Sequence, residues 1–265
     1  MSERSRKENN EKLSQRYPFI AIVGPVGIGK TTFTDLVVKD VGITQFQEPY
    51  QENPYLKDFY TKNPADFSFN SQMFFLANKG LQTRRVGEIV KSSPVVQDPG
   101  KEVDSIIATV QWKMGWMTDG EHNAYVAAFN KVFEGCLEPD VYIALKASEK
   151  TVIERIRNRE RYMELKMLEK YPEYFRLIVR EFNSWLKKKQ KEDDCRVNVI
   201  DNDRFDYAHD GEHRQIVINA TKNWLNYYLL SPSQRNGIGS DGVKLIIPTT
   251  FRTTPNLIDR APGQK

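Results

Sequence analysis

The sequence predicts an α/β domain in which helices cover both faces of a five-stranded parallel sheet. Short apolar runs rich in β-branched residues indicate buried strands, and long helical stretches separate them. The runs lie at 18–24, 94–98, 141–145 and 197–201, and a weaker strand is expected at 44–47. Strands that alternate with helices build parallel sheets with both faces covered, and this pattern sets the fold class.

The segments between these strands carry helical periodicity. Phe67, Phe74 and Leu81 recur at intervals of seven and predict one core-facing stripe on a helix. The segment 117–134 opens with Thr118-Asp-Gly-Glu121, the pattern of a capping box. The long charged segment 151–189 is interrupted by a proline, so we expect two helices there.

Length and composition favour one domain with an appendage at each end. A chain of 265 residues that is 39% hydrophobic can bury one substantial core. Residues 1–17 are strongly charged, and residues 231–265 are rich in glycine, proline, serine and threonine. We therefore expect a flexible charged arm at 1–17, a folded domain over 18–230 and an irregular tail over 231–265.

Composition argues against several other classes of protein. The sequence has no run of about 18 apolar residues and no apolar stretch near its start, so we expect no membrane association and a cytoplasmic location. Cys136 and Cys195 lack metal or redox spacing. The basic run 187–191 has no interleaved aromatic residues, which indicates a solvated helix end and no nucleic-acid partner.

The strongest motif follows the first predicted strand. Gly24-Pro-Val-Gly-Ile-Gly29-Lys30-Thr31 matches the phosphate-binding pattern GxxxxGK[ST]. Glycines let backbone amides surround phosphates, the lysine reaches the β- and γ-phosphates, and the threonine hydroxyl binds Mg²⁺. We therefore expect ATP and Mg²⁺ as cofactors. The residues expected to bind ATP are Gly24, Gly27, Gly29, Lys30, Thr31 and Thr32.

Glu48 is the first candidate on the acceptor side. Glu48-Pro49 follows the weak strand at 44–47, and ligands of open α/β sheets gather beyond the carboxyl ends of the strands. A carboxylate at that edge can orient an acceptor hydroxyl and take its proton. Taken alone, the residue is equally well explained as a solvated loop glutamate.

Together these motifs resemble the deoxynucleoside kinase family, over about residues 17–230. Four further segments carry the resemblance, namely 53–60, 71–76, 159–164 and 200–206. The first of them looks most like the bacterial purine-deoxynucleoside branch. The resemblance implies transfer of the γ-phosphate of ATP to the 5′-hydroxyl of a deoxynucleoside, a helical lid near 157–164, and a homodimer.

The resemblance also implies roles for single residues around the acceptor. Glu48 is similar to the general base that faces the 5′-hydroxyl, and Lys30 shares the catalytic step with it. Tyr60 and Glu164 look like the pair that binds the sugar 3′-hydroxyl. Gln72 is similar to the glutamine that holds the base edge, and its alternative is a capping or surface amide.

The lid segment offers two readings. Arg159 and Arg161 resemble lid arginines that clamp the phosphates of the donor, where they stabilise charge in the transition state. The alternative is a solvated helix face on which these arginines pair with neighbouring glutamates.

Lys79 lies seven residues after Gln72, and Asp104 lies six residues after Asp98. At these two offsets, relatives that use purines or cytosine resemble each other in carrying an arginine and an aspartate. An acid paired with a cation can meet the exocyclic amino group and ring acceptors of such bases. We therefore expect a purine deoxynucleoside or deoxycytidine to be preferred over thymidine. The alternative for Lys79 and Asp104 is a surface ion pair.

One segment departs from the family pattern. After the third strand the family carries an acid followed by arginine and serine, whereas this chain reads Asp98-Pro99-Gly100-Lys101. Asp98 keeps the acid that serves the metal, together with Thr31. Either Lys101 supplies the missing charge or transfer is weakened. Two other functions therefore stay open: a non-catalytic nucleotide-binding subunit, or a nucleoside monophosphate kinase.

Overall fold

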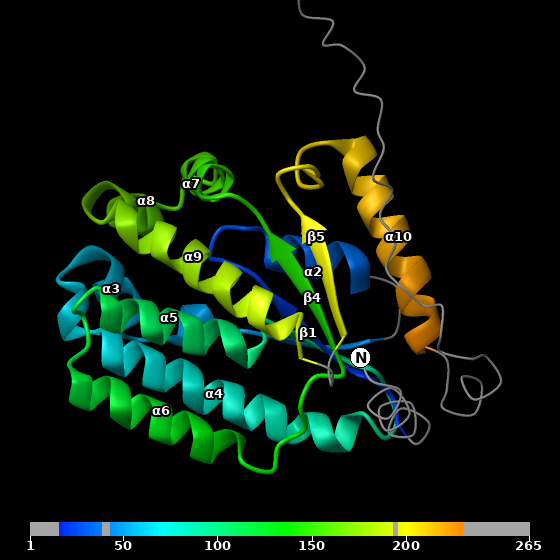
Figure 1. Ribbon diagram of the computed structural model, residues 1–265, viewed down its shortest axis with the longest axis horizontal. Coiled ribbons are helices and arrows are strands. Elements are labelled where there is room, and N and C mark those ends of the chain that lie inside the picture. The colour runs from blue at the N-terminus through cyan, green and yellow to red at the C-terminus, as the bar shows by residue number, and fades with distance from the viewer. Residues whose placement is uncertain (1–15, 39–42, 193–195, 230–265) are drawn as a thin grey trace, which may run out of the picture.

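The computed structural model describes residues 16–38, 43–192 and 196–229 (Figure 1). The expected arm, apart from its last two residues, and the expected tail at 231–265 lie outside these ranges. Cys195 lies outside them as well.

A single five-stranded parallel sheet forms the centre of the molecule. Its strands are β1 (Phe19–Val23), β2 (Thr44–Gln47), β3 (Val95–Asp98), β4 (Val141–Lys146) and β5 (Arg196–Asp201). They pair in the order β2-β3-β1-β4-β5, and every pair is parallel. The predicted fold class is confirmed, including the weak strand at 44–47.

Position in the sheet explains the strength of each strand signal. All five residues of β1 are buried because β3 and β4 flank this strand and helices cover it. By contrast, β2 is an edge strand whose residues are half-buried or exposed. An edge strand needs fewer apolar residues, and for that reason its sequence signal is weaker.

Helices cover both faces of the sheet, and Figure 1 shows α4, α5, α6 and α9 grouped on one side and α10 on the other. The helices are α2 (Lys30–Val38), α3 (Leu56–Thr61), α4 (Ser68–Ile89), α5 (Lys101–Lys113), α6 (Asp119–Phe133), α7 (Glu149–Asn158), α8 (Tyr162–Lys170), α9 (Pro172–Lys189) and α10 (Gly211–Leu229). Short 3-10 turns lie at Tyr50–Glu52 and Pro64–Asp66. Helix α10 packs against α2. No helix in the described part of the chain is long and apolar enough to cross a membrane.

The predicted core stripe on α4 is wrong. Leu81 is 66% exposed, and Phe67 precedes the helix. The buried face is largely polar and consists of Ser68, Ser71, Gln72, Phe75, Leu76, Lys79, Gly80, Thr83 and Val86. Apolar periodicity missed this face because α4 turns polar groups inward toward the ends of β2 and β3, where ion pairs and hydrogen bonds satisfy several of them.

Two helix boundaries were predicted correctly and one was not. Thr118 and Glu121 form the predicted capping box at the start of α6. The break before Pro172 is present, but a second break separates α7 from α8. At this second break Glu160 adopts a positive φ of 51°, a backbone conformation that no glycine or proline signals in the sequence.

Candidate active site

The phosphate-binding loop joins the carboxyl end of β1 to the start of α2, as the motif predicts. Gly27 and Gly29 adopt φ values of 81° and 97°, which are open to glycine but strained for other residues. A Cβ on Gly27 would also lie 2.5 Å from Cγ1 of Ile156. The motif therefore needs glycine at both positions for steric reasons.

Lys30 lies folded back over its own loop. Its Nζ donates to the carbonyl oxygens of Gly24 and Pro25, each at 2.9 Å. Burial lowers the pKa of Lys30, and the carboxylates of Asp98 and Glu48 act in the opposite direction. The side chains of Thr31 and Thr32 are exposed at the start of α2. The loop thus presents a cation and two hydroxyls at a helix N-terminus, where anions bind.

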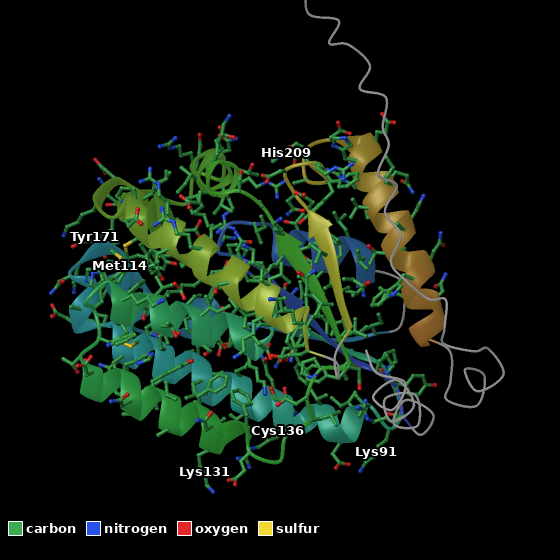
Figure 2. All side chains as sticks on the ribbon, in the orientation of Figure 1. Lys91, Met114, Lys131, Cys136, Tyr171 and His209 are labelled. Atoms are coloured by element: carbon green, nitrogen blue, oxygen red, sulfur yellow. The ribbon has the colours of Figure 1, made fainter. Side chains whose placement is uncertain are left out.

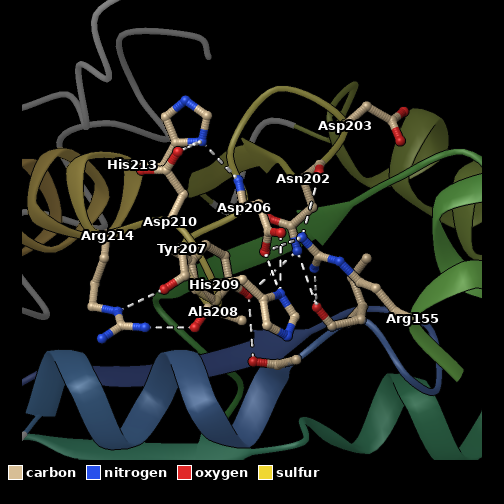
Figure 3. Close-up of polar contacts among 12 residues, drawn as sticks. Arg155, Asn202, Asp203, Asp206, Tyr207, Ala208, His209, Asp210, His213 and Arg214 are labelled. Atoms are coloured by element: carbon tan, nitrogen blue, oxygen red, sulfur yellow. Dashed lines mark hydrogen bonds and ion pairs between the residues drawn. The ribbon is translucent and has the colours of Figure 1, made fainter. Parts of the chain in front are cut away.

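The loop is braced from behind by two other parts of the chain (Figure 3). The Arg155 guanidinium of α7 donates to the Ile28 carbonyl at 2.7 Å, and Asn202 Nδ2 donates to the same oxygen at 3.1 Å. The Tyr207 hydroxyl donates to the Gly29 carbonyl at 3.4 Å. The sequence gives no signal for this contact of Arg155, because its partner is a backbone carbonyl, which no side-chain motif marks.

Within the described ranges, the histidines and Cys136 belong to no cluster of potential metal ligands. Figure 2 places His209 on the loop between β5 and α10, where its ring contacts the Asp206 carboxylate at 3.1 Å. Cys136 is half-buried beyond the end of α6. The described residues contain no cluster of three or more His, Cys, Asp or Glu side chains that could hold a metal ion.

Asp98 and Glu48 lie side by side at the carboxyl edge of the sheet. Gln47 pairs with Asp98 in the β2–β3 register, and the Glu48 amide donates to the Asp98 carbonyl at 3.1 Å. Asp98 is 2% exposed, and its carboxylate lies beside the Thr31 hydroxyl. Burial raises the pKa of Asp98, whereas Lys30 and Thr31 lower it. A buried carboxylate beside a threonine hydroxyl fits the oxygen ligands of Mg²⁺, which also keeps waters and phosphate oxygens.

Lys79 reaches this edge from α4. Its Nζ donates to the Pro99 carbonyl at 2.7 Å and lies 3.4 Å from Glu48 Oε1 and 3.8 Å from Asp104 Oδ2. The side chains of Lys79 and Asp104 are 2% and 4% exposed, so the surface ion pair considered above is wrong. The two residues do lie together, as their offsets implied.

The pKa shifts of this group follow from burial and charge. Burial favours the neutral form of Lys79, but Asp104, Glu48 and Asp98 together outweigh it, and the pKa of Lys79 is raised. Burial raises the pKa of Asp104 well above its usual range, and the negative charge of Glu48 adds to this effect. Lys79 is therefore an ammonium beside an Asp104 side chain that resists ionisation.

Gln72 and Tyr125 also contribute buried polar atoms. Gln72 is 3% exposed and its Oε1 has no hydrogen-bond partner, so the surface-amide alternative is wrong. The Tyr125 hydroxyl of α6 is buried without a partner, and burial, Asp104 and Glu48 raise its pKa. Helical spacing placed Tyr125 in the core and gave no signal for this hydroxyl.

The lid segment at 157–164 brings Glu164 and the two arginines into the region of Tyr60, which lies on α3. Arg159 bonds Glu164 Oε1, and Arg161 Nη1 lies 3.7 Å from the same oxygen. Burial raises the pKa of Tyr60 well above its usual value, and the charges of Glu164 and Glu48 contribute. The structure thus pairs both arginines with Glu164, and the phosphate-clamping role of Arg159 and Arg161 stays a prediction.

Lys101 does not supply charge to the phosphate site. Its Nζ bonds Glu138 Oε1 at 2.5 Å and lies 4.9 Å from the centre of the Phe133 ring. Glu138 precedes β4, whereas the phosphate-binding loop follows β1, so the two sit at opposite ends of parallel strands. The expectation that Lys101 supplies the charge of the missing arginine is therefore wrong.

A phosphate-binding loop, a buried acid beside it and a second carboxylate on the adjacent strand define a P-loop phosphotransferase. The chain belongs to the deoxynucleoside kinase family, whose model, described as deoxynucleoside kinase, matches residues 20–226. The family assignment confirms the resemblance and makes the chain a kinase.

Known relatives agree with this assignment. The chain is similar to the deoxyguanosine kinase of Bacillus subtilis (strain 168), with 29% identity over 194 residues that cover 72% of this chain and 89% of the relative. The deoxyadenosine kinase of Dictyostelium discoideum shares 31% identity over 153 residues, which cover 58% of this chain and 61% of the relative. The structure of deoxyadenosine kinase from M. mycoides with bound dCTP aligns with a TM-score of 0.63 at 27% identity, covering 78% of this chain and 98% of that chain.

Proposed function

We propose that this kinase transfers the γ-phosphate of ATP to the 5′-hydroxyl of a deoxynucleoside, with Mg²⁺ as the metal. The observation that carries the proposal is the placement of Glu48 directly beside Asp98 at the sheet edge from which the phosphate-binding loop departs. A general base for the acceptor hydroxyl and an acid for the metal then lie at the same edge of the sheet, as in-line phosphoryl transfer requires. The proposed location is the cytoplasm, and a homodimer stays the expectation from the resemblance.

On the donor side, the loop amides and Lys30 bind the phosphates. Thr31 and Asp98 are the residues proposed to hold Mg²⁺, which when bound neutralises charge on the phosphate oxygens. Transfer spreads negative charge over the oxygens of the phosphoryl group, so a cation already fixed beside them stabilises the transition state. Arg159 and Arg161 are proposed to add to this charge after exchanging Glu164 for phosphate.

On the acceptor side, Glu48 accepts the proton of the attacking hydroxyl. Tyr60 and Glu164 are proposed to bind the sugar 3′-hydroxyl, since both lie in one region with Glu48. Gln72 and Asp104 each have a buried oxygen without a hydrogen-bond partner, and these atoms are suited to a base edge. Buried polar atoms left unpaired cost free energy, so a ligand that pairs them binds selectively.

An ATP-dependent turnover assay with a panel of nucleosides and nucleoside monophosphates tests this proposal. The expected product is the 5′-monophosphate of a deoxynucleoside, identified by chromatography together with ADP. Turnover with monophosphates alone would instead assign a nucleoside monophosphate kinase. Tight binding of ATP with Mg²⁺ and no transfer to any acceptor would assign a non-catalytic subunit.

We expect a purine deoxynucleoside or deoxycytidine to have a higher kcat/KM than thymidine. The unpartnered Asp104 Oδ2 can accept from an exocyclic amino group, which thymine lacks, and Gln72 can both donate and accept. The relatives above, a deoxyguanosine and a deoxyadenosine kinase, are consistent with this preference. Competition among the four deoxynucleosides in one reaction measures it, and thymidine as the best substrate contradicts it.

Lys101 contacts Glu138 and lies away from the phosphate site, so its removal should affect stability more than catalysis. We expect Lys101→Ala to keep kcat within about threefold of wild type, because its ammonium makes no contact with the transferred phosphate. The variant should melt at a lower temperature, since it loses the Glu138 ion pair and the contact with Phe133. Steady-state kinetics and thermal melting measure both effects, and a tenfold loss of kcat contradicts the structural assignment.

A further inference from the structure

Four separate elements meet at the ammonium of Lys79. The lysine comes from α4, Glu48 follows β2, Pro99 follows β3 and Asp104 lies on α5. The side chain of Lys79 is 2% exposed, while that of Glu48 is 23% exposed. The lysine is thus an interior cation at the place where the Glu48 carboxylate reaches the surface of the site.

Two hydrogen bonds fix the Lys79 ammonium. It donates to the Pro99 carbonyl at 2.7 Å and to Glu48 Oε1 at 3.4 Å. Asp104 Oδ2 lies 3.8 Å away, which is within ion-pair distance but too far for a hydrogen bond. The shorter of the two hydrogen bonds joins Lys79 to Pro99, which occupies the position where the family carries an arginine.

Geometry favours Glu48 as the carboxylate partner of Lys79. Glu48 Oε1 accepts a hydrogen bond from Lys79 at 3.4 Å, whereas Asp104 Oδ2 lies 3.8 Å away, and burial raises the pKa of Asp104 well above its usual range. Asp98 acts on Lys79 from beyond ion-pair distance, and the charges of Asp98 and Glu48 also act on Lys30. Among the described residues in contact with Lys79, Glu48 is therefore the carboxylate that it holds.

We propose that Lys79 is a positioning residue for phosphoryl transfer: anchored on the Pro99 carbonyl, its ammonium holds Glu48 Oε1 and directs the carboxylate toward the acceptor hydroxyl. The inference rests on the proposed function of Glu48. It gives the altered Asp98-Pro99 segment a role, because the carbonyl of residue 99 anchors a lysine in a chain that lacks the arginine. Lys79 holds Oε1 of Glu48, and the Glu48 side chain stays partly exposed. The second carboxylate oxygen of Glu48 is therefore free to accept the proton of a hydroxyl.

Kinetics distinguish a positioning role of Lys79 from recognition of the nucleobase. A positioning residue acts on the reacting hydroxyl, which every deoxynucleoside shares, so its removal lowers kcat for all of them. We expect Lys79→Met to lower kcat at least tenfold for deoxyadenosine, deoxyguanosine, deoxycytidine and thymidine alike. The order of their KM values should stay unchanged, and Lys79→Arg, which keeps the charge, should retain more activity than Lys79→Met.

A double-mutant cycle with Glu48→Gln tests whether Lys79 acts through Glu48. Residues that act as one unit are strongly non-additive. We expect Glu48→Gln with Lys79→Met to have nearly the kcat of Glu48→Gln alone. Lys101→Met is the matched control, because Lys101 is also a buried lysine paired with a glutamate but lies away from the site. Its kcat should stay close to wild type.

Each other outcome overturns the inference. Additive losses in the cycle, or a KM increase confined to some bases, assign Lys79 to base recognition. If Lys79→Met unfolds, Lys79→Gln takes its place, because glutamine keeps a donor for the Pro99 carbonyl. The same loss of kcat and the same non-additivity with Glu48→Gln are expected for it. Unfolding of both neutral variants makes Lys79 a stability residue. A wild-type protein without transfer activity overturns the proposed function as well, whereas an active wild type with any of these results overturns the inference alone.

Discussion

Lys30→Ala is expected to abolish measurable phosphotransfer while the protein stays folded. Loss of a hydrogen bond to a charged group costs about 1.5 to 3 kcal/mol in binding, and loss of a transition-state contact costs about 10² to 10³ in kcat. The fold should persist because, among the residues that the structure describes, the Lys30 ammonium donates its hydrogen bonds to carbonyls of its own loop.

Turnover, calorimetric binding of ATP and thermal melting together check this expectation. Lys131→Ala is a suitable control, since Lys131 pairs with Glu134 on the exposed end of α6. A Lys30→Ala variant that turns over at the wild-type rate removes the phosphate-binding loop from the mechanism.

Glu48→Gln is expected to lower kcat by about 10² to 10⁴, the usual contribution of a general base. Glutamine keeps the length and hydrogen-bonding reach of the side chain but cannot accept the proton. Lys79 keeps its contacts with the Pro99 carbonyl and Asp104, so the local structure should survive. Binding of the deoxynucleoside should therefore persist.

Single-turnover kinetics and calorimetry separate these effects. Glu52→Gln is the matched control, because Glu52 is an exposed glutamate in the turn that follows Glu48. An unchanged rate with lost nucleoside binding would falsify the base assignment and make Glu48 a sugar ligand.

The sheet and the donor loop could be predicted because their signals are local. Buried parallel strands need continuous apolar residues, and β1 is buried at every position. The loop needs glycine at fixed places, where Gly27 and Gly29 have positive φ. Both requirements act within a few residues of chain, so they are visible in the sequence.

The acceptor side was harder to predict because its interactions join distant segments. Lys101 is close to Pro99 in sequence, yet its side chain contacts Glu138, while Lys79, 20 residues away in the chain, bonds the Pro99 carbonyl. Leu81 followed apolar spacing but is exposed, since α4 turns its polar face inward. Sequence spacing shows which residues share a helix face, but it does not show what that face meets.

The hydrogen bond from the Glu48 amide to the Asp98 carbonyl makes the spacing between the two halves of the site a property of the sheet. Strand pairing is among the stiffest features of a domain, so the alignment of hydroxyl, phosphorus and leaving oxygen is largely set when the chain folds. The residues proposed to meet the nucleobase, Gln72 and Asp104, lie on α4 and α5, which do not belong to this pairing. Substitutions at these two positions are therefore expected to change which nucleoside is accepted, while the strand pairing keeps Glu48 and Asp98 at the same spacing.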